Sequence, residues 1–212
     1  MKKDKNFYAL ILAGGLGSRF WPASKESLPK QFIDLTGSGK TLIQETFIRI
    51  QKVIHIENIF ISTNEKYKEL VLKQIPEISS KNLICEQVKR NTAPSILYAS
   101  LKISQINKKS KVIVLPSDHY IKKLNEFYKN VEHAFSVSKS DRLVTFGINP
   151  HFPSTNYGYI EVNDTKESFQ KVIRFTEKPG KELAEKFLRS NMYFWNSGIF
   201  IWSTESILNA FK

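Results

Sequence analysis

The stretch LILAGGLGSRFWPASKESLPKQF, residues 10–32, leads from an apolar run into three glycines and then to two cations, Arg19 and Lys30. An apolar run that enters a glycine-rich segment is typical of a buried strand that turns sharply at its carboxyl end. Glycine allows left-handed backbone angles and close approach, so such a turn can present backbone N–H groups to an anion. Arg19 and Lys30 would then supply charge to a polyphosphate. The alternative is a glycine-rich turn with two surface cations, and the turn alone does not decide between them.

Two common phosphate motifs are absent. A dinucleotide-binding loop needs a third glycine where Phe20 stands. The segment GSGKT, residues 37–41, resembles the end of a P-loop, but the first glycine of that motif is replaced by Asp34 and the segment does not directly follow a strand. Thr41 and Gln44 instead predict a capping box that opens a helix.

Composition predicts a globular protein. The chain has 212 residues with 41% hydrophobic and 25% charged residues and a net charge of +12. The lysines are spread along the chain, which favours a solvated surface over a nucleic-acid site. Cys85 is the single cysteine, and the sequence has neither a signal peptide nor about 18 consecutive apolar residues. We therefore expect a cytoplasmic protein that has no membrane or nucleic-acid partner.

Apolar runs alternate with helical periodicity along the chain, which predicts an α/β fold: a three-layer, Rossmann-like, mostly parallel sheet with helices on both faces. The expected strands are residues 7–13, 59–63, 83–87, 111–116 and 143–148, and the expected helices are residues 41–53, 66–75, 94–106 and 126–139. After residue 150, mixed or antiparallel strands and one helix extend the same sheet. Residues 1–212 are expected to form a single domain. The final segment, STESILNAFK, predicts a helix capped by Ser203 or Thr204 that continues beyond Lys212.

Five motifs in order carry a family resemblance. They are residues 10–32, RNTAPSI (90–96), LPSDHYI (115–121), FTEKP (175–179) and WNSGIFIW (195–202). The chain resembles the sugar nucleotidyltransferases, and in particular their mannose-1-phosphate guanylyltransferase branch, from residue 7 to about residue 203. Phe20 and Lys25 depart mildly from the usual leucine and arginine of the first motif. The resemblance implies the nucleotide-diphospho-sugar transferase fold and the synthesis of GDP-mannose and pyrophosphate from GTP and mannose 1-phosphate with Mg²⁺.

The resemblance also implies roles for individual residues. Arg19 and Lys30 would hold the departing phosphates, Asp118 would bind the metal, and Lys178 would bind the sugar phosphate. The expected nucleotide-binding residues are Leu12, Ala13, Gly14, Gly15, Gly17, Ser18, Arg19, Lys30, Glu86, Asn91 and Thr92. The expected sugar-phosphate residues are Gly158, Glu177, Lys178 and Asn196. A second metal aspartate, usual after the WNSG segment, has no counterpart that we can place.

Each of these residues also has an ordinary structural interpretation. Asp118 follows an apolar strand, where an aspartate is either a metal ligand or a turn residue, and His119 beside it is expected to be structural. Glu86 suits the donor edge of guanine, but it is equally an acid at a strand end. Asn156 replaces a glycine of the family in STNYGYI, and Asn196 also suits a turn with Gly198.

Three functional alternatives stay open at this point. The chain could be a uridylyl- or thymidylyltransferase acting on another hexose 1-phosphate, an inactive fragment that binds nucleotide sugars, or a basic nucleic-acid module. The oligomeric state is also open, with a homo-oligomer among the possibilities.

Overall fold

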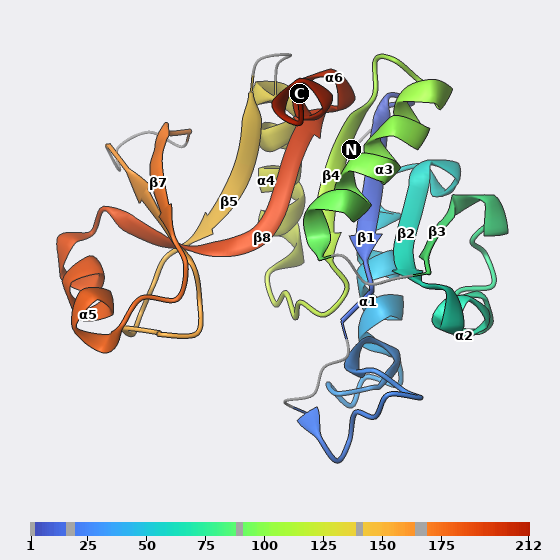
Figure 1. Ribbon diagram of the computed structural model, residues 1–212, viewed down its shortest axis with the longest axis horizontal. Helices are drawn as coiled ribbons and strands as arrows, with labels where there is room; N and C mark the ends of the chain where they lie inside the picture. The colour runs from blue at the N-terminus through green and yellow to red at the C-terminus, as the bar shows by residue number, and fades with distance from the viewer. Residues whose placement is uncertain (1–2, 16–19, 88–90, 139–141, 164–168) are drawn as a thin grey trace. The chain divides into compact units, whose positions relative to one another are not determined.

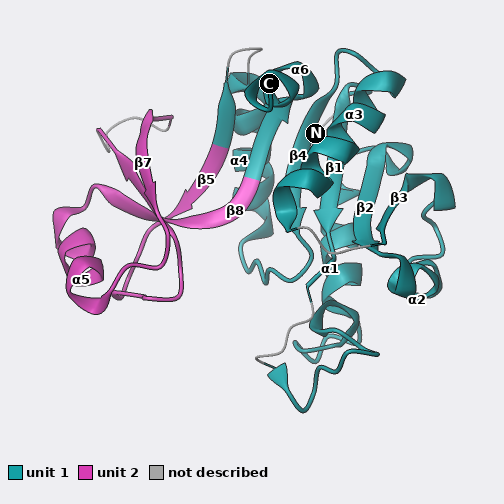
Figure 2. Ribbon diagram, in the orientation of Figure 1, with its two compact units in different colours: residues 1–144, 200–212 teal, residues 145–199 magenta. Residues whose placement is uncertain are grey.

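The structure is a computed structural model that describes residues 3–15, 20–87, 91–138, 142–163 and 169–212. It divides into two compact units (Figure 2). The first comprises residues 1–144 and 200–212, and the second comprises residues 145–199. The expectation of a single domain stays a prediction.

The first unit is built on a sheet with parallel central strands. β1 (Phe7–Leu12) pairs in parallel with β2 (Ile59–Asn64) on one side and with β4 (Lys111–Pro116) on the other. β3 (Leu83–Glu86) extends the parallel part beyond β2, and the carboxyl end of β8 (Tyr193–Ser203) pairs antiparallel with β4. The carboxyl ends of β1 to β4 therefore meet at one edge of the sheet, which is where ligands collect in open α/β folds.

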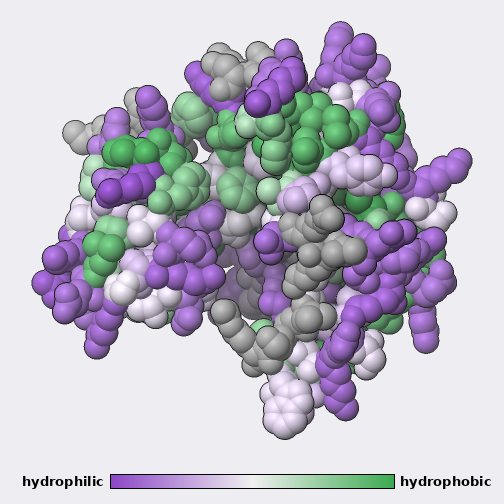
Figure 3. Space-filling view, viewed as in Figure 1, coloured by the Kyte–Doolittle hydropathy of each residue, from purple (hydrophilic) through white to green (hydrophobic). Residues whose placement is uncertain are grey.

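Helices cover both faces of this sheet (Figure 1). On one face, α3 (Thr92–Ile106) and α6 (Thr204–Ala210) pack on a core that includes Leu10, Val114 and Trp202. On the other face, α4 (Leu124–Val137) places Phe135 against Phe7, with the ring centroids 3.9 Å apart. The predicted three-layer α/β/α fold class is confirmed. Apolar side chains also reach the surface over α3 and α6 (Figure 3), and Leu101 and Phe211 are among the exposed ones.

Helix termini follow the predicted capping residues. α1 (Leu42–Ile50) begins at the N-cap Thr41, whose N–H donates to the Gln44 side chain over 2.9 Å. α6 begins at the N-cap Ser203, whose hydroxyl accepts from the N–H of Ser206 over 3.0 Å. α2 (Lys68–Gln74) also belongs to this unit. No helix among the described residues is both long enough and apolar enough to cross a membrane.

The P-loop-like segment is filled by the chain's own carboxylate. Asp34 accepts hydrogen bonds from the N–H groups of Thr36, Gly37, Ser38 and Gly39, and Gly37 and Gly39 have positive φ angles of 71° and 77°. The turn thus forms a small anion nest whose anion is Asp34. The glycines and N–H groups that would hold a phosphate in a P-loop therefore hold the carboxylate of Asp34 in this chain.

The second unit is antiparallel, as the sequence predicted for the region after residue 150. β6 (Tyr159–Val162) pairs with β7 (Val172–Thr176) and with the amino-terminal part of β8. β5 (Leu143–Ile148), which begins in the first unit, also pairs with β8. α5 (Lys181–Ser190) buries Phe187 against Tyr159 and Tyr193, and the rings of Phe187 and Tyr193 stack at 3.8 Å.

Candidate active site

The glycine turn after β1 is held from beneath by Gln31. The Gln31 side chain is 1% exposed, and its amide nitrogen donates to the carbonyls of Ala13 over 2.9 Å and Gly15 over 3.0 Å. Both partners are carbonyl oxygens, so the orientation of the side-chain amide is fixed by chemistry. A trans peptide places its N–H opposite its carbonyl. The N–H of exposed Gly14 therefore points away from Gln31, as an anion site requires.

Lys30 and Gln31 leave one short 3-10 turn in different directions. The turn spans Lys30–Phe32, with Phe32 packed in the core against Tyr67. Lys30 instead remains partly exposed and forms an ion pair with Asp118, and its ammonium lies 5.5 Å from the centre of the Phe20 ring. The structure therefore brings together two of the predicted catalytic residues. Gly17, Ser18 and Arg19 lie outside the described residues.

Asp118 lies in the turn that follows β4, beside β1. The N–H of Ser117 donates to the carbonyl of Leu12, the last residue of β1, over 3.1 Å. The side chains of Asp118 and Lys30 are 23% and 25% exposed, so solvent reaches both. The turn after β4 and the glycine turn after β1 are thus neighbours at the carboxyl edge of the sheet.

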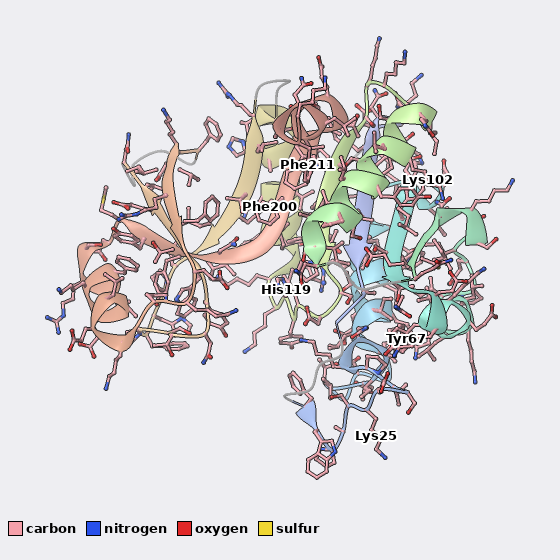
Figure 4. The ribbon with its side chains drawn as sticks, viewed as in Figure 1. Lys25, Tyr67, Lys102, His119, Phe200 and Phe211 are labelled. Carbon is pink, nitrogen blue, oxygen red and sulfur yellow. The ribbon has the colours of Figure 1, made fainter. Side chains whose placement is uncertain are left out.

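Two residues of α1 support the Asp118 turn, and no sequence pattern indicated either of them. The Thr46 hydroxyl donates to the carbonyl of Ser117 over 3.2 Å. The Arg49 guanidinium donates to the Thr46 hydroxyl over 2.9 Å and to the carbonyl of His119 over 3.2 Å. Figure 4 labels His119 where β4 ends. Burial lowers the pKa of the Arg49 guanidinium, with Glu45 and Tyr128 opposing that shift, but an arginine stays protonated.

His119 is half-buried beside Asp118, and the structural role expected from the sequence stays a prediction. Burial lowers the pKa of its imidazole below the ordinary value, Asp118 acts in the opposite direction, and the cations Arg49 and Lys30 lower it further. An imidazole with a lowered pKa is mainly neutral near pH 7. His119 therefore contributes its backbone carbonyl, but no positive charge, to this edge of the sheet.

The residues predicted to face the base lie at the same edge. Glu86 is the last residue of β3 and is half-buried, and Thr92 is the first residue of α3. Asn91 precedes α3 with a φ of 65° and a ψ of −168°, a strained backbone conformation that is otherwise almost confined to glycine. Buried Ser95 in the first turn of α3 bonds to Ser62 of β2 over 2.6 Å, which fixes the start of the helix on the sheet.

The predicted sugar-phosphate residues gather in the second unit. Gly158 precedes Tyr159, whose partners across the sheet are Thr176 on β7 and Trp195 on β8. Glu177 and Asn196 follow those partners, so the three predicted residues stand level on neighbouring strands. The N–H of Asn196 donates to the carbonyl of Gly158 over 2.8 Å. A Cβ on Gly158 would lie 2.8 Å from the carboxylate of Glu177.

Lys178 completes this group. Its ammonium pairs with Glu177 over 2.9 Å, and its side chain is 51% exposed. Lys178 has a positive φ of 43°, so the chain turns there immediately after the strand. Asn196 also accepts from the N–H of Gly198 over 3.0 Å, and Gly198 has a φ of 71°. The side-chain oxygen of Asn196 therefore supports a turn. That its side-chain NH₂ group binds a ligand stays a prediction.

The side chains around Asp118 suit Mg²⁺, which needs few protein ligands, better than a metal ion that is held by protein side chains alone. Among the described residues, no three His, Cys, Asp or Glu side chains are grouped around a common point. Mg²⁺ is usually held by one or two carboxylates together with substrate phosphates and waters. One partly exposed carboxylate next to a turn whose Gly14 N–H points outward fits that pattern.

Comparison with known proteins identifies the family. The sequence profile of the nucleotidyl transferase family matches residues 8–210. The chain belongs to the nucleotidyl transferase family. It is 38% identical over 206 residues to a mannose-1-phosphate guanylyltransferase of Klebsiella pneumoniae, covering 94% of this chain and 43% of that protein. It is 39% identical to a mannose-1-phosphate guanylyltransferase of Salmonella montevideo, with 96% of this chain and 44% of that protein covered. The chain thus spans less than half the length of these curated relatives.

Solved structures agree with this family fold. A Thermus thermophilus protein described as mannose-1-phosphate geranyltransferase superposes with a TM-score of 0.89 at 28% identity, over 97% of this chain and 60% of that chain. A Helicobacter pylori protein described as mannose-6-phosphate isomerase gives a TM-score of 0.78 at 30% identity, over 96% of this chain and 73% of that chain. The chain accordingly has a sugar nucleotidyltransferase fold.

Proposed function

We propose that this nucleotidyl transferase makes GDP-mannose and pyrophosphate from GTP and mannose 1-phosphate. The observation that carries the proposal is the Lys30–Asp118 ion pair beside the glycine turn pinned by Gln31. It joins a phosphate-binding cation and a metal-binding carboxylate at a turn that offers backbone N–H groups. The choice of GTP and mannose 1-phosphate rests on the names of relatives that are 35–39% identical.

In the proposed complex the first unit holds the nucleotide. The N–H groups of the glycine turn and the cations Arg19 and Lys30 bind the β- and γ-phosphates, which depart as pyrophosphate. Binding of GTP draws Lys30 from Asp118 to the phosphates, and Asp118 becomes free to hold Mg²⁺. When bound there, Mg²⁺ would neutralise the phosphate charge that grows in the transition state. Glu86, Asn91 and Thr92 surround the base and ribose.

The second unit holds the sugar phosphate in this proposal. Glu177 accepts from sugar hydroxyls, Asn196 donates to them, and Gly158 leaves room for the ring. Lys178 exchanges its ion pair with Glu177 for one with the phosphate. A phosphate oxygen of mannose 1-phosphate attacks the α-phosphorus of GTP, the new P–O bond forms, and the bond to pyrophosphate breaks. The attacking phosphate is already anionic at neutral pH, so the reaction needs no general base.

A nucleotide competition tests the assignment. The chain is supplied with equal amounts of GTP, UTP, dTTP and ATP, with mannose 1-phosphate and Mg²⁺, and the nucleotide sugars are separated chromatographically. GDP-mannose is the expected main product. A preference for UTP or dTTP would contradict the assignment and identify a uridylyl- or thymidylyltransferase. Binding of GDP-mannose without release of pyrophosphate would identify an inactive nucleotide-sugar-binding fragment.

A further inference from the structure

The buried cation Arg49 has no ionic partner that explains its place in the core. It is 5% exposed, and among the described residues no carboxylate lies within ion-pair distance of it. Its Nε is buried and has no hydrogen-bond partner, and its guanidinium lies 5.7 Å from the centre of the Phe127 ring. Burying an arginine without a carboxylate is costly, so an apolar residue would give α1 a more stable contact here.

The hydrogen bonds that Arg49 does form converge on one turn. Its Nη2 donates one hydrogen bond to the His119 carbonyl and one to the Thr46 hydroxyl. The Thr46 hydroxyl in turn donates a hydrogen bond to the Ser117 carbonyl. Both donors of Nη2 and the single hydroxyl proton are thereby used. Ser117 and His119 are the residues directly before and after Asp118. The chain of bonds therefore closes around the backbone of Asp118 while its side chain pairs with Lys30 on the other side.

We infer that Thr46 and Arg49 are positioning residues that clamp the Asp118 turn for metal binding. The inference rests on the proposed function, because it assigns Asp118 to Mg²⁺. Mg²⁺ demands near-ideal octahedral geometry, so a ligand on a loose turn loses affinity for it. Asp118 must also exchange Lys30 for the metal without a shift of its backbone. A clamp that acts only on the two flanking carbonyls leaves the carboxylate free to make that exchange.

The first test measures the clamp itself, without any ligand. Amide hydrogen exchange by mass spectrometry is followed in a peptide that covers residues 115–121. Thr46→Val removes the hydroxyl at nearly unchanged volume, and we expect faster exchange in this peptide than in the wild-type protein. Thr46→Ser keeps the hydroxyl and should exchange at the wild-type rate. The control Ile43→Val removes a methylene from another fully buried position of α1 and should leave the peptide unchanged. Wild-type exchange in Thr46→Val would overturn the clamp.

The second test measures what the clamp does for the metal. GTP binding is measured calorimetrically at increasing Mg²⁺ concentration with no sugar phosphate present, so that nothing turns over. We expect Mg²⁺ to increase the affinity of the wild-type protein for GTP, and we expect Thr46→Val and Arg49→Lys to reduce that increase about tenfold. Arg49→Lys keeps the charge, but the lysine side chain is one bond shorter than the path to Nη2 and leaves its ammonium short of the two acceptors. Thr46→Ser and Ile43→Val should retain the full increase.

The variant Asp118→Asn distinguishes failure of the positioning role from failure of the proposed metal site. If it loses the Mg²⁺-dependent increase while Thr46→Val keeps it, the positioning role is wrong and the metal site stands. If Asp118→Asn keeps the increase, the proposed metal site itself is wrong. The hydrogen-exchange result decides the clamp in either case, because that measurement uses neither GTP nor metal.

Discussion

Replacing Gln31 with methionine tests whether the glycine turn must be fixed in advance to bind a nucleotide. Methionine fills nearly the same volume, so the change removes hydrogen bonds without opening a cavity. Two bonds are lost, of 2.9 Å to Ala13 and 3.0 Å to Gly15. The Ala13 carbonyl keeps its 3.1 Å bond from the Thr63 hydroxyl, and exposed Gly15 can be solvated. At about 1 kcal/mol per net hydrogen bond, we expect the free energy of unfolding to fall by about 1–2 kcal/mol.

The substitution should also weaken the binding of GTP, by a cost that is separate from the stability loss. A turn that is no longer pinned must be ordered when the nucleotide binds, and ordering the backbone of one residue costs about 1–2 kcal/mol. That cost corresponds to about a 5- to 30-fold rise in the dissociation constant for GTP. Urea unfolding monitored by tryptophan fluorescence gives the stability, and calorimetry gives the GTP affinity.

A matched variant shows how much of the loss in GTP affinity comes from the unpinned glycine turn. Thr63→Val removes the other side-chain bond to the Ala13 carbonyl but leaves both bonds of Gln31 in place. It should lose a similar free energy of unfolding and bind GTP within about twofold of the wild-type protein. If Gln31→Met binds GTP as tightly as Thr63→Val, Gln31 stabilises the core only and the pinned turn has no role in nucleotide binding.

Three further predictions concern single contacts. Gly158→Ala should leave Tm unchanged, because the exposed Glu177 carboxylate can move away from the new methyl, but the KM for mannose 1-phosphate should rise about tenfold as that acceptor is displaced. Lys178→Met should raise the same KM about tenfold in a salt-dependent way, whereas Lys186→Met, an exposed lysine of α5, should leave it unchanged; equal effects would contradict a specific role. Desolvation raises the pKa of Asp34, but the four N–H donors outweigh it and hold the pKa below its ordinary value. Its contribution to stability is therefore complete above about pH 3.9 and is lost as the pH falls through the lower folded pKa, so the Tm difference between the wild-type protein and Asp34→Asn should shrink in acid and should not widen.

The elements that sequence patterns predict well are those whose apolar spacing matches their burial. β1 and β4 are almost continuously buried because helices cover both faces of the sheet, and that burial appears in the sequence as an unbroken apolar run. Thr41 and Ser203 are found at helix starts because their hydrogen bonds are local in the chain. The level arrangement of Gly158 with Glu177 depends on strand register, which spacing alone does not determine. The family motifs implied only that both residues bind the sugar phosphate.

The features that escaped prediction depend on contacts distant in sequence. Arg49 is a charged residue on an amphipathic helix, so a pattern assigns it to the solvent side, yet its acceptor His119 is 70 residues away. The left-handed backbone of Lys178 is equally hidden, because lysine has no preference for a positive φ. The division into two units also leaves no mark in the sequence, since the alternating burial of β8 runs from Phe194 to Ile201 and so continues across the boundary after Ile199.

The adjacent residues Lys30 and Gln31 explain why the opening motif is long. A glycine turn alone could bind phosphate wherever N–H groups point outward, but its conformation would vary. Gln31 fixes the turn through two carbonyls, and Lys30, one residue earlier in the same 3-10 turn, reaches Asp118 on the neighbouring turn. The position of the Lys30 charge relative to the glycine turn is therefore set by a single 3-10 turn and not by two independent loops. Thr46 and Arg49 hold the Asp118 turn in the same manner, through backbone carbonyls. Both turns are thus fixed from the interior, which leaves the outward-facing charged side chains free to change partners when a substrate binds.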